Sequence, residues 1–405
     1  MKLPTEWRVL PFGEVVEHSQ YGISTPTSPD GTIPILGMKN INDGQVVVGN
    51  PDRVSITEAV LAKQRLKDGD LLFNRTNSLD LVGKTGLFRE SGDFVCASYL
   101  VRFRLRRNLV DPRYVCYLFN TSHSQRIMRQ LATKAVAQAN INPTSLQRKF
   151  LLPLPPRQEQ VAIADLLEFW DDDICRTESR LGKKLEFKRG LMQQLLTGQT
   201  QFKEFKGKPW RKLHLGDIVN FEPRVVPKPK GAFLAAGIRS HGKGVFLKRD
   251  FEAEDIALDE LFVLRADDLV VNITFGWEGA AAIVPSEADG ALVSHRFPTF
   301  TFKPAVSFPG YFRHVIKQKR FVHAMGLASP GGAGRNRVLS KTEFMRIPID
   351  LPSMAEQERI ATVLNDCDRE IELLQKQLDA LKEQKRGLMQ KLLTGEIRVK
   401  APDKI

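Results

Sequence analysis

Side chains that can recognise nucleic-acid bases follow an apolar run in the first half of the chain. The run Leu71-Leu72-Phe73 leads into Asn74-Arg75-Thr76-Asn77-Ser78, and Lys84 follows shortly after. Arginine pairs with guanine edges, asparagine pairs with adenine edges, and both types also bind phosphate. The same residue types are common in turns, where they bond the local backbone. We expect DNA contacts from four of these residues: Asn74, Arg75, Asn77 and Lys84.

A glycine-rich segment in the second half has similar chemistry. Residues 329–337 read SPGGAGRNR and end in Arg335, Asn336 and Arg337. Such a segment can follow phosphates or enter a groove, and it can equally be an ordinary connection. The corresponding stretch of the first half, residues 134–142, begins with Lys134 and is polar but less basic. We add Lys134, Arg335, Asn336 and Arg337 to the DNA-binding candidates.

Strings typical of catalysis or metal binding are absent from the sequence. Val82-Gly83-Lys84-Thr85 is similar to the end of a phosphate-binding loop, but Ser78 occupies the place of the required first glycine. We interpret it as a tight turn that leads into a strand. The histidines form no HExxH motif and the four cysteines form no CxxC pair. We therefore predict no catalytic residues, no metal site and no cofactor bound by this chain.

Composition points to a polyanionic partner. The net charge is +13 and the isoelectric point is about 9.6, which favours binding to nucleic acid. No run of eighteen apolar residues could span a membrane, and the N-terminus lacks the apolar core of a signal peptide. We expect a cytoplasmic protein that binds double-stranded DNA and has no membrane partner.

One long segment occurs twice in the sequence. Residues 154–198 align without a gap to residues 351–395, with identity at nearly half of the positions. This agreement indicates an internal duplication. Both copies carry apolar residues at heptad spacing, which predicts two helices that pair through a coiled-coil seam. The predicted seam and partner-docking residues are Leu167, Ile174, Leu181, Leu191, Leu195, Leu364, Ile371, Leu378, Leu388 and Leu392.

Local signals mark the ends of these helices. The stretch from Ser353 to Glu356 has the form of a capping box, and Gly198 and Gly395 stand where a helix C-terminus favours a left-handed residue. Each helix should run for about 40 residues, or about 60 Å. If the two helices pack antiparallel, the molecule gains an approximate two-fold axis.

The segments before the two helices are also related. Residues 6–15 resemble 209–218, and residues 68–76 resemble 266–274, although Ile273 replaces Arg75. Short apolar runs predict strands, including a half-buried strand at 101–105. Residues 113–131 and 310–325 have helical patterns.

The fold class is therefore α+β, with two mixed α/β domains separated by two long antiparallel helices in a pseudo-two-fold arrangement. We predict the boundaries 1–153, 154–199, 200–350 and 351–399.

These motifs together resemble the specificity subunit of type I restriction–modification systems. The resemblance rests on Leu-Pro…Glu-Gln at the start of both long helices, at 154–160 and 351–357, and on the strings at 69–78 and 81–85. It implies two target-recognition domains that read a bipartite DNA site with an unspecified spacer of fixed length.

The resemblance also implies partners. The helices would dock two modification subunits, which bind S-adenosylmethionine and methylate adenine. Restriction subunits that use ATP and Mg would join the full complex, and the specificity subunit itself would carry no catalytic centre. The second half lacks the Asn-Arg-Thr-Asn-Ser string, so recognition contacts do not transfer to it from the first half.

Two other functions compete with this interpretation. The chain could be a protein–protein scaffold whose basic charge is incidental, in which case it would bind partners without any affinity for DNA. It could also be an ATP-using enzyme built on residues 82–85, which nucleotide binding would reveal.

Overall fold

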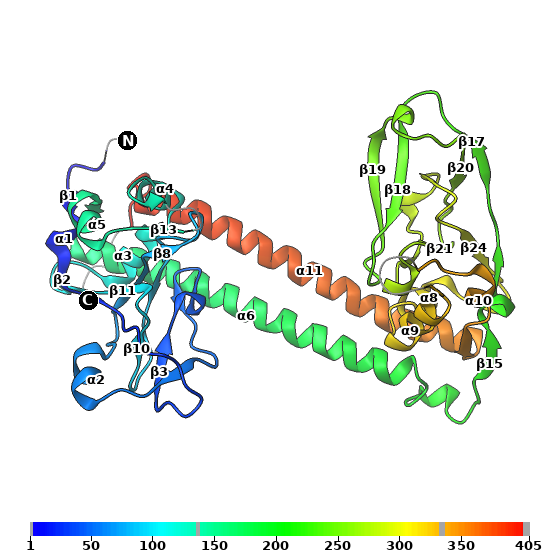
Figure 1. Ribbon diagram of the computed structural model, residues 1–405, viewed down its shortest axis with the longest axis horizontal. Helices are drawn as coiled ribbons and strands as arrows, with labels where there is room; N and C mark the ends of the chain where they lie inside the picture. The colour runs from blue at the N-terminus through cyan, green and yellow to red at the C-terminus, as the bar shows by residue number, and fades with distance from the viewer. Residues whose placement is uncertain (1–2, 135–137, 332–336, 400–405) are drawn as a thin grey trace. The chain divides into compact units, whose positions relative to one another are not determined.

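The computed structural model describes residues 3–134, 138–331 and 337–399 (Figure 1). The chain forms two compact units. Unit 1 comprises residues 1–178 and 376–405, and unit 2 comprises residues 179–375. Each unit holds one mixed α/β region together with part of each long helix. The four-part division predicted from the sequence keeps each helix whole and stays a prediction.

Unit 1 is built around one six-stranded sheet. Its strand order is β2 (Val16–Tyr21), β11 (Leu100–Leu105), β7 (Leu71–Asn74), β9 (Thr85–Leu87), β5 (Gln45–Val46) and β4 (Ile41–Asn42). Smaller sheets join β1 (Arg8–Pro11) to β14 (Leu151–Leu154), β10 (Val95–Cys96) to β3 (Ile33–Leu36) and β6 (Asp52–Val54), and β12 (Thr133–Lys134) to β13 (Ala139–Asn140) and β8 (Thr76–Asn77). The helices are α1 (Phe12–Val15), α2 (Glu58–Gln64), α3 (Pro112–Phe119), α4 (Ser122–Gln130) and α5 (Pro143–Lys149).

Unit 2 repeats the central part of this sheet. A four-stranded sheet runs β16 (Val219–Phe221), β24 (Thr299–Phe302), β21 (Leu269–Val271) and β22 (Ala281–Ile283), in the same order as β2, β11, β7 and β9. A second sheet runs β17 (Val225–Pro227), β20 (Glu260–Val263), β23 (Leu292–Val293), β18 (Phe233–Ile238) and β19 (Val245–Phe251), and β15 (Arg211–His214) pairs with β25 (Pro348–Leu351). The helices are α7 (Leu215–Ile218), α8 (Pro309–Val315), α9 (Lys319–Leu327) and α10 (Lys341–Met345).

The predicted helical regions each consist of two short helices. In unit 1, Asp111 caps α3 and Thr121 caps α4 through side-chain hydrogen bonds to backbone N–H groups. In unit 2, α8 and α9 occupy the corresponding places. The helical prediction is right for both regions, and a break divides each of them; a side chain, Thr121, caps the helix after the break in unit 1, whereas Gln318 makes no such bond in unit 2.

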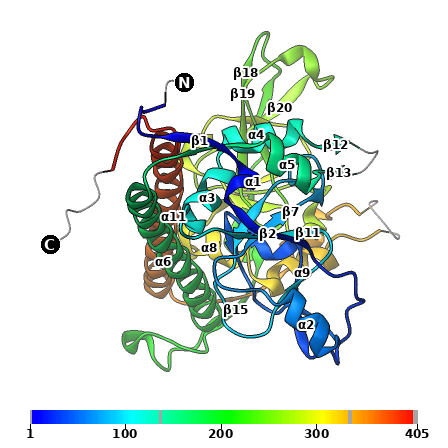
Figure 2. The ribbon, with the colours of Figure 1, turned by 90° about the vertical axis from the view of Figure 1, so that its left-hand side faces the viewer.

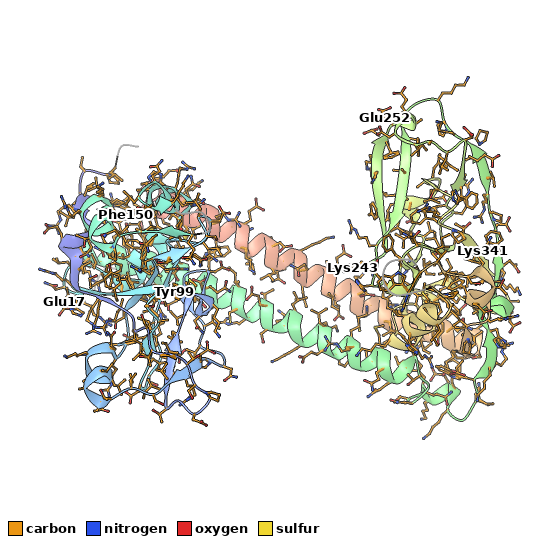
Figure 3. The ribbon with its side chains drawn as sticks, viewed as in Figure 1. Glu17, Tyr99, Phe150, Lys243, Glu252 and Lys341 are labelled. Carbon is orange, nitrogen blue, oxygen red and sulfur yellow. The ribbon has the colours of Figure 1, made fainter. Side chains whose placement is uncertain are left out.

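The core of unit 1 is aromatic. Phe12 is completely buried and makes edge contacts with Phe103 and Phe119, at ring-centroid distances of 5.0 and 4.8 Å. Phe150 extends the cluster at 5.0 Å from Phe119, and Figure 3 shows its position among the packed side chains of the unit. Aromatic rings that meet edge-on or tilted stabilise a core by more than the burial of their apolar surface alone.

The prediction of a half-buried strand at residues 101–105 is wrong in its burial. Arg102 in β11 is only 3% exposed. Its guanidinium donates to the carbonyl oxygen of Arg65 at 2.7 Å and to the side chain of Gln20, while Arg104 makes a two-pronged contact with buried Asp70. Arg102 and Arg104 lie on the same face of the strand. The alternation of apolar and basic residues therefore reflects hydrogen-bonded arginines on one covered sheet face, not a face open to solvent.

The two long helices are α6 (Arg157–Leu195) and α11 (Met354–Leu393), and they pack side by side (Figures 1 and 2). In unit 1, Asp171 pairs with Lys385 and Glu178 pairs with Lys382. In unit 2, Lys184 pairs with Glu370 and Lys188 pairs with Asp368. As the residue number rises along α6 it falls along α11, so the helices run antiparallel within each unit.

The predicted seam residues are buried or half-buried, and their pairing across the seam stays a prediction. Five of them are buried, namely Leu167, Leu195, Leu364, Leu378 and Leu392. The other five are half-buried, namely Ile174, Leu181, Leu191, Ile371 and Leu388. The ends of the helices enter the cores of the units: Leu392 and Leu393 lie in the core of unit 1, and Leu195 and Leu196 lie in the core of unit 2.

The repeated Glu-Gln pair at the start of each long helix has a structural purpose. The amide of Gln160 donates to Pro155 O at 3.0 Å and accepts from Asp111 N at 2.9 Å. Gln357 makes the same two bonds, to Pro352 O and from Phe308 N, at the same distances. Both glutamines are buried, and each ties the start of its long helix to the residue that precedes a short helix, Asp111 before α3 and Phe308 before α8.

The adjacent glutamates bond the segments that follow the opposite helix ends. Glu159 accepts two hydrogen bonds from Arg398, at 2.6 and 2.8 Å. Glu356 accepts from Gln201 at 3.3 Å, and its backbone N–H donates to Ser353 Oγ at 3.4 Å. Ser353 thus caps α11 as predicted. The Glu356 carboxylate accepts its hydrogen bond from the side chain of Gln201. Gly198 and Gly395 adopt the left-handed conformation predicted for them, with φ of +71° and +73°.

A polar junction braces the helix pair inside each unit. In unit 1 the Tyr117 hydroxyl donates to Asp171 at 2.7 Å, and Lys385 lies 5.1 Å from the centre of the Tyr117 ring. In unit 2 the residue 197 positions after Tyr117 is His314, and the aspartate and lysine are Asp368 and Lys188. His314 is completely buried and its Nε2 lies 2.9 Å from Asn365 Oδ1.

The pKa of His314 is lowered from 6.5 to about 4. Burial is the main cause; the hydrogen bond to Asn365 and the charge of Asp368 raise the pKa in part, and the positive charges of Lys188 and Lys317 lower it. His314 is thus neutral in the folded protein at neutral pH. None of the helices in the described residues is long and apolar enough to cross a membrane.

The His314 junction should make unit 2 sensitive to acid. Below pH 6.5 His314 becomes protonated in the unfolded chain, whereas in the folded chain it stays neutral until the pH falls to about 4. The folded state should therefore lose up to about 3 kcal/mol between these values, at 1.36 kcal/mol per pKa unit. The H314Y variant, which copies Tyr117, should remove this part of the pH dependence in thermal unfolding measured from pH 7 to 4. The reciprocal Y117H variant should add such a dependence, and equal profiles for all three proteins would contradict the assignment.

The ion pair of unit 1 gives a second prediction. Lys385 and Asp171 are only 13% and 14% exposed, whereas Lys382 and Glu178 are 40% and 48% exposed. Replacement of Lys385 by Met leaves a mostly buried carboxylate without its cation and should cost about 3 kcal/mol. Replacement of Lys382 by Met should cost less than about 1 kcal/mol, because exposed pairs contribute little. Urea unfolding would measure both, and similar losses would refute the ranking.

Candidate nucleic-acid interface

Unit 1 contains a shallow basic hollow. Its volume is about 430 Å³, and we call it hollow 1. The lining residues are Leu79, Arg126, Arg129, Gln130, Ala132 and Lys134. Three of these carry positive charge and none is acidic. The hollow thus presents cations on a concave surface, which suits an anionic ligand.

Unit 2 contains a larger hollow of about 560 Å³, which we call hollow 2. The lining residues are His241, Trp277, Lys317, Lys319, Val322, His323, Gly326, Leu327 and Arg337. The side chains of Lys317, Lys319 and His323 are exposed to solvent. Again no lining residue is acidic, and Trp277 adds a large aromatic surface.

The two hollows occupy the same place in the repeated fold. Each lies between the loop that follows the central strand, β7 or β21, and the second short helix, α4 or α9. The helix positions match one to one: Arg126, Arg129 and Gln130 are followed 197 positions later by His323, Gly326 and Leu327. Each unit therefore has a concave surface at this place, and the cations of hollow 2, Lys317, Lys319 and Arg337, come from other positions than those of hollow 1.

A positive-φ glycine lets the helix approach the loop in both units. Gly83 has φ of +89°, and a Cβ there would meet Gln125 Oε1 and Met128 Sδ at 3.3 Å. Gly279 has φ of +72°, and its Cβ would meet Val322 Cγ2 at 2.9 Å. Gln125 also donates to Gly83 O at 2.9 Å. The glycines thus permit the close contact that fixes the helix beside the loop.

In unit 2 a strand turn closes the rim of the hollow. The turn between β18 and β19 contains His241, Gly242 and Lys243 (Figure 3). The backbone N–H of His241 donates to Glu278 O at 2.9 Å, and that of Gly242 donates to Gly279 O at 3.1 Å. These bonds hold His241 beside Trp277, where it lines hollow 2.

The residues predicted to contact DNA fall in several environments. Asn74 ends β7, is 1% exposed, and exchanges backbone bonds with Lys84 and Gly83. The Arg75 guanidinium lies 4.9 Å from the centre of the Tyr21 ring, and the Asn77 side chain accepts from Ser78 N.

Lys134 lines hollow 1 and Arg337 lines hollow 2, whereas Arg335 and Asn336 lie outside the described residues. The Val82–Thr85 stretch forms a turn that leads into β9, as the sequence predicts.

Apart from Lys134 and Arg337, sequence reasoning missed the residues that the structure gathers around the hollows. Arg126 and Arg129 stand three apart on α4, and Lys319 and His323 stand four apart on α9, so each pair shares a helix face. The available signal was this helical spacing of basic side chains within each half, because the aligned positions of the two halves carry different residue types. Among the described residues, no group of three or more His, Cys, Asp or Glu is arranged to hold a metal ion.

Comparison with known proteins identifies the fold. A family model described as the type I restriction modification DNA specificity domain matches residues 4–186 and again residues 207–383. The MjaX specificity subunit of Methanocaldococcus jannaschii is 26% identical over 98% of this chain and 95% of its own length. The MjaVIII specificity subunit of the same organism is 22% identical over 99% and 95%.

A solved structure has the same fold. The crystal structure of the type I restriction–modification S subunit from M. genitalium is 16% identical, covers 100% of this chain and 99% of its own, and superposes with a TM-score of 0.59. The duplicated family match spans most of both halves and coincides with the repeat in the sequence. The chain therefore belongs to the type I restriction–modification specificity family and is the DNA specificity subunit of such a system.

Proposed function

We propose that the chain recognises a bipartite duplex site, with one half-site read by each unit on the face that carries its hollow. The observation that supports this most is the duplicated basic hollow, because two equivalent cationic surfaces fit two DNA segments. The excess charge of +13 supplies the general attraction to phosphate. Arg75, Asn77, Lys84, Lys134 and Arg337 remain candidates for contacts around the two faces. A specificity subunit is the non-catalytic member of its system.

The paired helices would set the separation of the two half-sites. Helices of 39 and 40 residues extend for about 60 Å at 1.5 Å per residue. The ion pairs Asp171–Lys385 and Lys188–Asp368 fix the register of the helices inside each unit. A stiff connection of constant length favours a spacer of fixed length and unspecified sequence, since nothing on the connection needs to read bases.

The outer faces of the same helices would dock two modification subunits. Large apolar side chains are exposed there: Phe169 is 62%, Phe187 is 55% and Leu373 is 59% exposed. Such residues favour burial against a protein partner. The modification subunits would bind S-adenosylmethionine and methylate adenine, and restriction subunits using ATP and Mg would complete the assembly in the cytoplasm.

The spacing proposal is tested by changing the length of the DNA spacer. The methylation pattern of a host with and without the gene would first give the bipartite motif. Insertion of three to five base pairs between the half-sites should then lower the affinity of the specificity–modification complex on the order of 10³-fold, to the level of non-specific binding. Unchanged affinity would refute the fixed spacing, and binding to modification subunits with no DNA affinity at all would favour the scaffold alternative.

The hollow proposal is tested through the dependence of binding on salt. Replacement of Arg126 by Ala removes one cation from hollow 1, which should weaken binding and lower the slope of log K against log salt by about one. The K63A variant changes the net charge equally but lies on α2, away from the hollow. A filter-binding series from 50 to 200 mM salt compares the two. Equal slopes for both variants would place the phosphate contacts elsewhere.

A further inference from the structure

Three equivalent positions beside the hollows carry opposite chemistry in the two units. Unit 1 has a side-chain amide at each position, and unit 2 has a large apolar side chain at each. The amides are Asn77, Gln130 and Asn140, and the apolar residues, found 197 or 198 positions later, are Phe275, Leu327 and Val338. We call these three apolar residues the apolar rim.

Matching contacts show that the positions are equivalent in the fold. In unit 1 the backbone N–H of Ile141 donates to Arg75 O at 2.8 Å. In unit 2 the backbone N–H of Leu339 donates to Ile273 O at 2.9 Å. Each bond lies one residue after position 140 or 338 and joins it to the residue two before position 77 or 275. The third position is the last residue of α4 and of α9, which have nine residues each.

The apolar rim gathers at one place because the segment 338–340 contacts both of its other parts. The backbone N–H of Ser340 donates at 2.9 Å to the carbonyl oxygen of the residue after Leu327. An ideal Cβ on the glycine after Phe275 would lie 3.1 Å from the Cβ of Leu339. The three apolar side chains therefore come from neighbouring stretches of chain beside hollow 2.

All three side chains of the apolar rim are exposed to solvent. Leu327 is 73%, Val338 is 53% and Phe275 is 41% exposed. Isolated exposed apolar residues are common, whereas a group of them marks a contact with another molecule. Leu327 also lines hollow 2, where Lys317 and Lys319 are positively charged and no lining residue is acidic. This charge favours DNA over a protein as the molecule that covers the rim.

Duplex DNA offers an apolar group that such a rim can contact. The C5-methyl group of thymine projects into the major groove, and apolar side chains recognise it by direct contact. Side-chain amides instead pair with the N6 and N7 atoms of adenine. The change from three amides to three apolar side chains therefore changes which base features a unit can read.

We propose that the apolar rim of unit 2 contacts thymine methyl groups in the half-site that this unit reads. Lys317 and Lys319 bind the phosphates beside these bases. The amides of unit 1 make hydrogen bonds to base edges at the equivalent place, so its half-site is read there without methyl contacts. The inference rests on the proposed function, since it requires that unit 2 binds a DNA half-site.

Replacement of thymine by uracil tests the inference. Each thymine of both half-sites is replaced in turn by deoxyuridine, which lacks the methyl group and still pairs with adenine. The affinity of the specificity–modification complex is measured for each duplex. At a contacted thymine the affinity should fall about fourfold, which corresponds to the burial of one methyl group.

Variants that copy unit 1 connect this loss to the apolar rim. Phe275→Asn, Leu327→Gln and Val338→Asn each place an amide at one position, and each should bind the thymine and uracil duplexes equally at the thymine it contacts. Gln130→Leu is the matched change in unit 1 and should leave the dependence of unit 2 intact. An adenine that the modification subunits extrude affects every variant equally, so it produces no difference between them. Thermal unfolding checks that each variant is folded.

The possible outcomes separate this inference from the proposed function. Methyl dependence in one half-site that the amide variants remove and Q130L keeps supports the inference. Specific, spacer-dependent binding without any methyl dependence overturns it and leaves the proposed function standing, as does a dependence that survives in all three amide variants. Amide variants that keep the methyl dependence but no longer assemble with modification subunits would assign the rim to protein docking. Absence of all site-specific binding by the wild-type complex refutes the proposed function itself.

Discussion

The antiparallel pairing of α6 and α11 is the constraint on which the rest of the structure depends. Neither mixed α/β region completes its own core, because each takes in the start of one long helix and the end of the other. Leu392 and Leu393 close the core of unit 1, and Leu195 and Leu196 close that of unit 2. The ion pairs Asp171–Lys385 and Lys188–Asp368 fix the register, since a shift by one helical turn would leave the mostly buried charges of Asp171, Lys385 and Lys188 without their partners. The core of each unit is therefore complete only when both long helices are in place.

The duplication has conserved and changed different parts of the molecule for physical reasons. Residues that join the helices to the units, such as Gln160 and Gln357, keep both identity and geometry because each satisfies two buried backbone groups. The junction residues Tyr117 and His314 differ in type, but each lies near an aspartate and a lysine at equivalent positions of the long helices. At the hollows the side chains face solvent, so packing does not limit them and their chemistry has diverged.

Sequence reasoning could predict the parts of this structure that depend on local pattern. The heptads gave the helices and their seam, and the capping residues Ser353, Gly198 and Gly395 gave their ends, because these signals are contained within a few turns of chain. The burial of Arg102 was not predictable, since its partners Gln20 and Arg65 lie far away in the sequence. The hollows were missed for the same reason: residues of a loop, a helix and a strand turn meet only when the sheet has formed. Of the predicted contacts, Lys134 and Arg337 do line the hollows, whereas Asn74 is held inside the sheet.

The residues that anchor the structure differ from the residues that face the hollows, and this explains how the two hollow surfaces can change without loss of the fold. The hollow-facing residues of α9 lie on the opposite side of the helix from Phe321 and Met325, which anchor it in the core. A substitution such as arginine to glycine at the position of Arg129 and Gly326 then alters what the surface can bind while the apolar anchors stay in place. The cost is limited to the lower helix propensity of glycine, about 1 kcal/mol, which a core of this size can absorb. The residues that face the hollow can thus vary, because the apolar residues on the other face of the helix stabilise the fold.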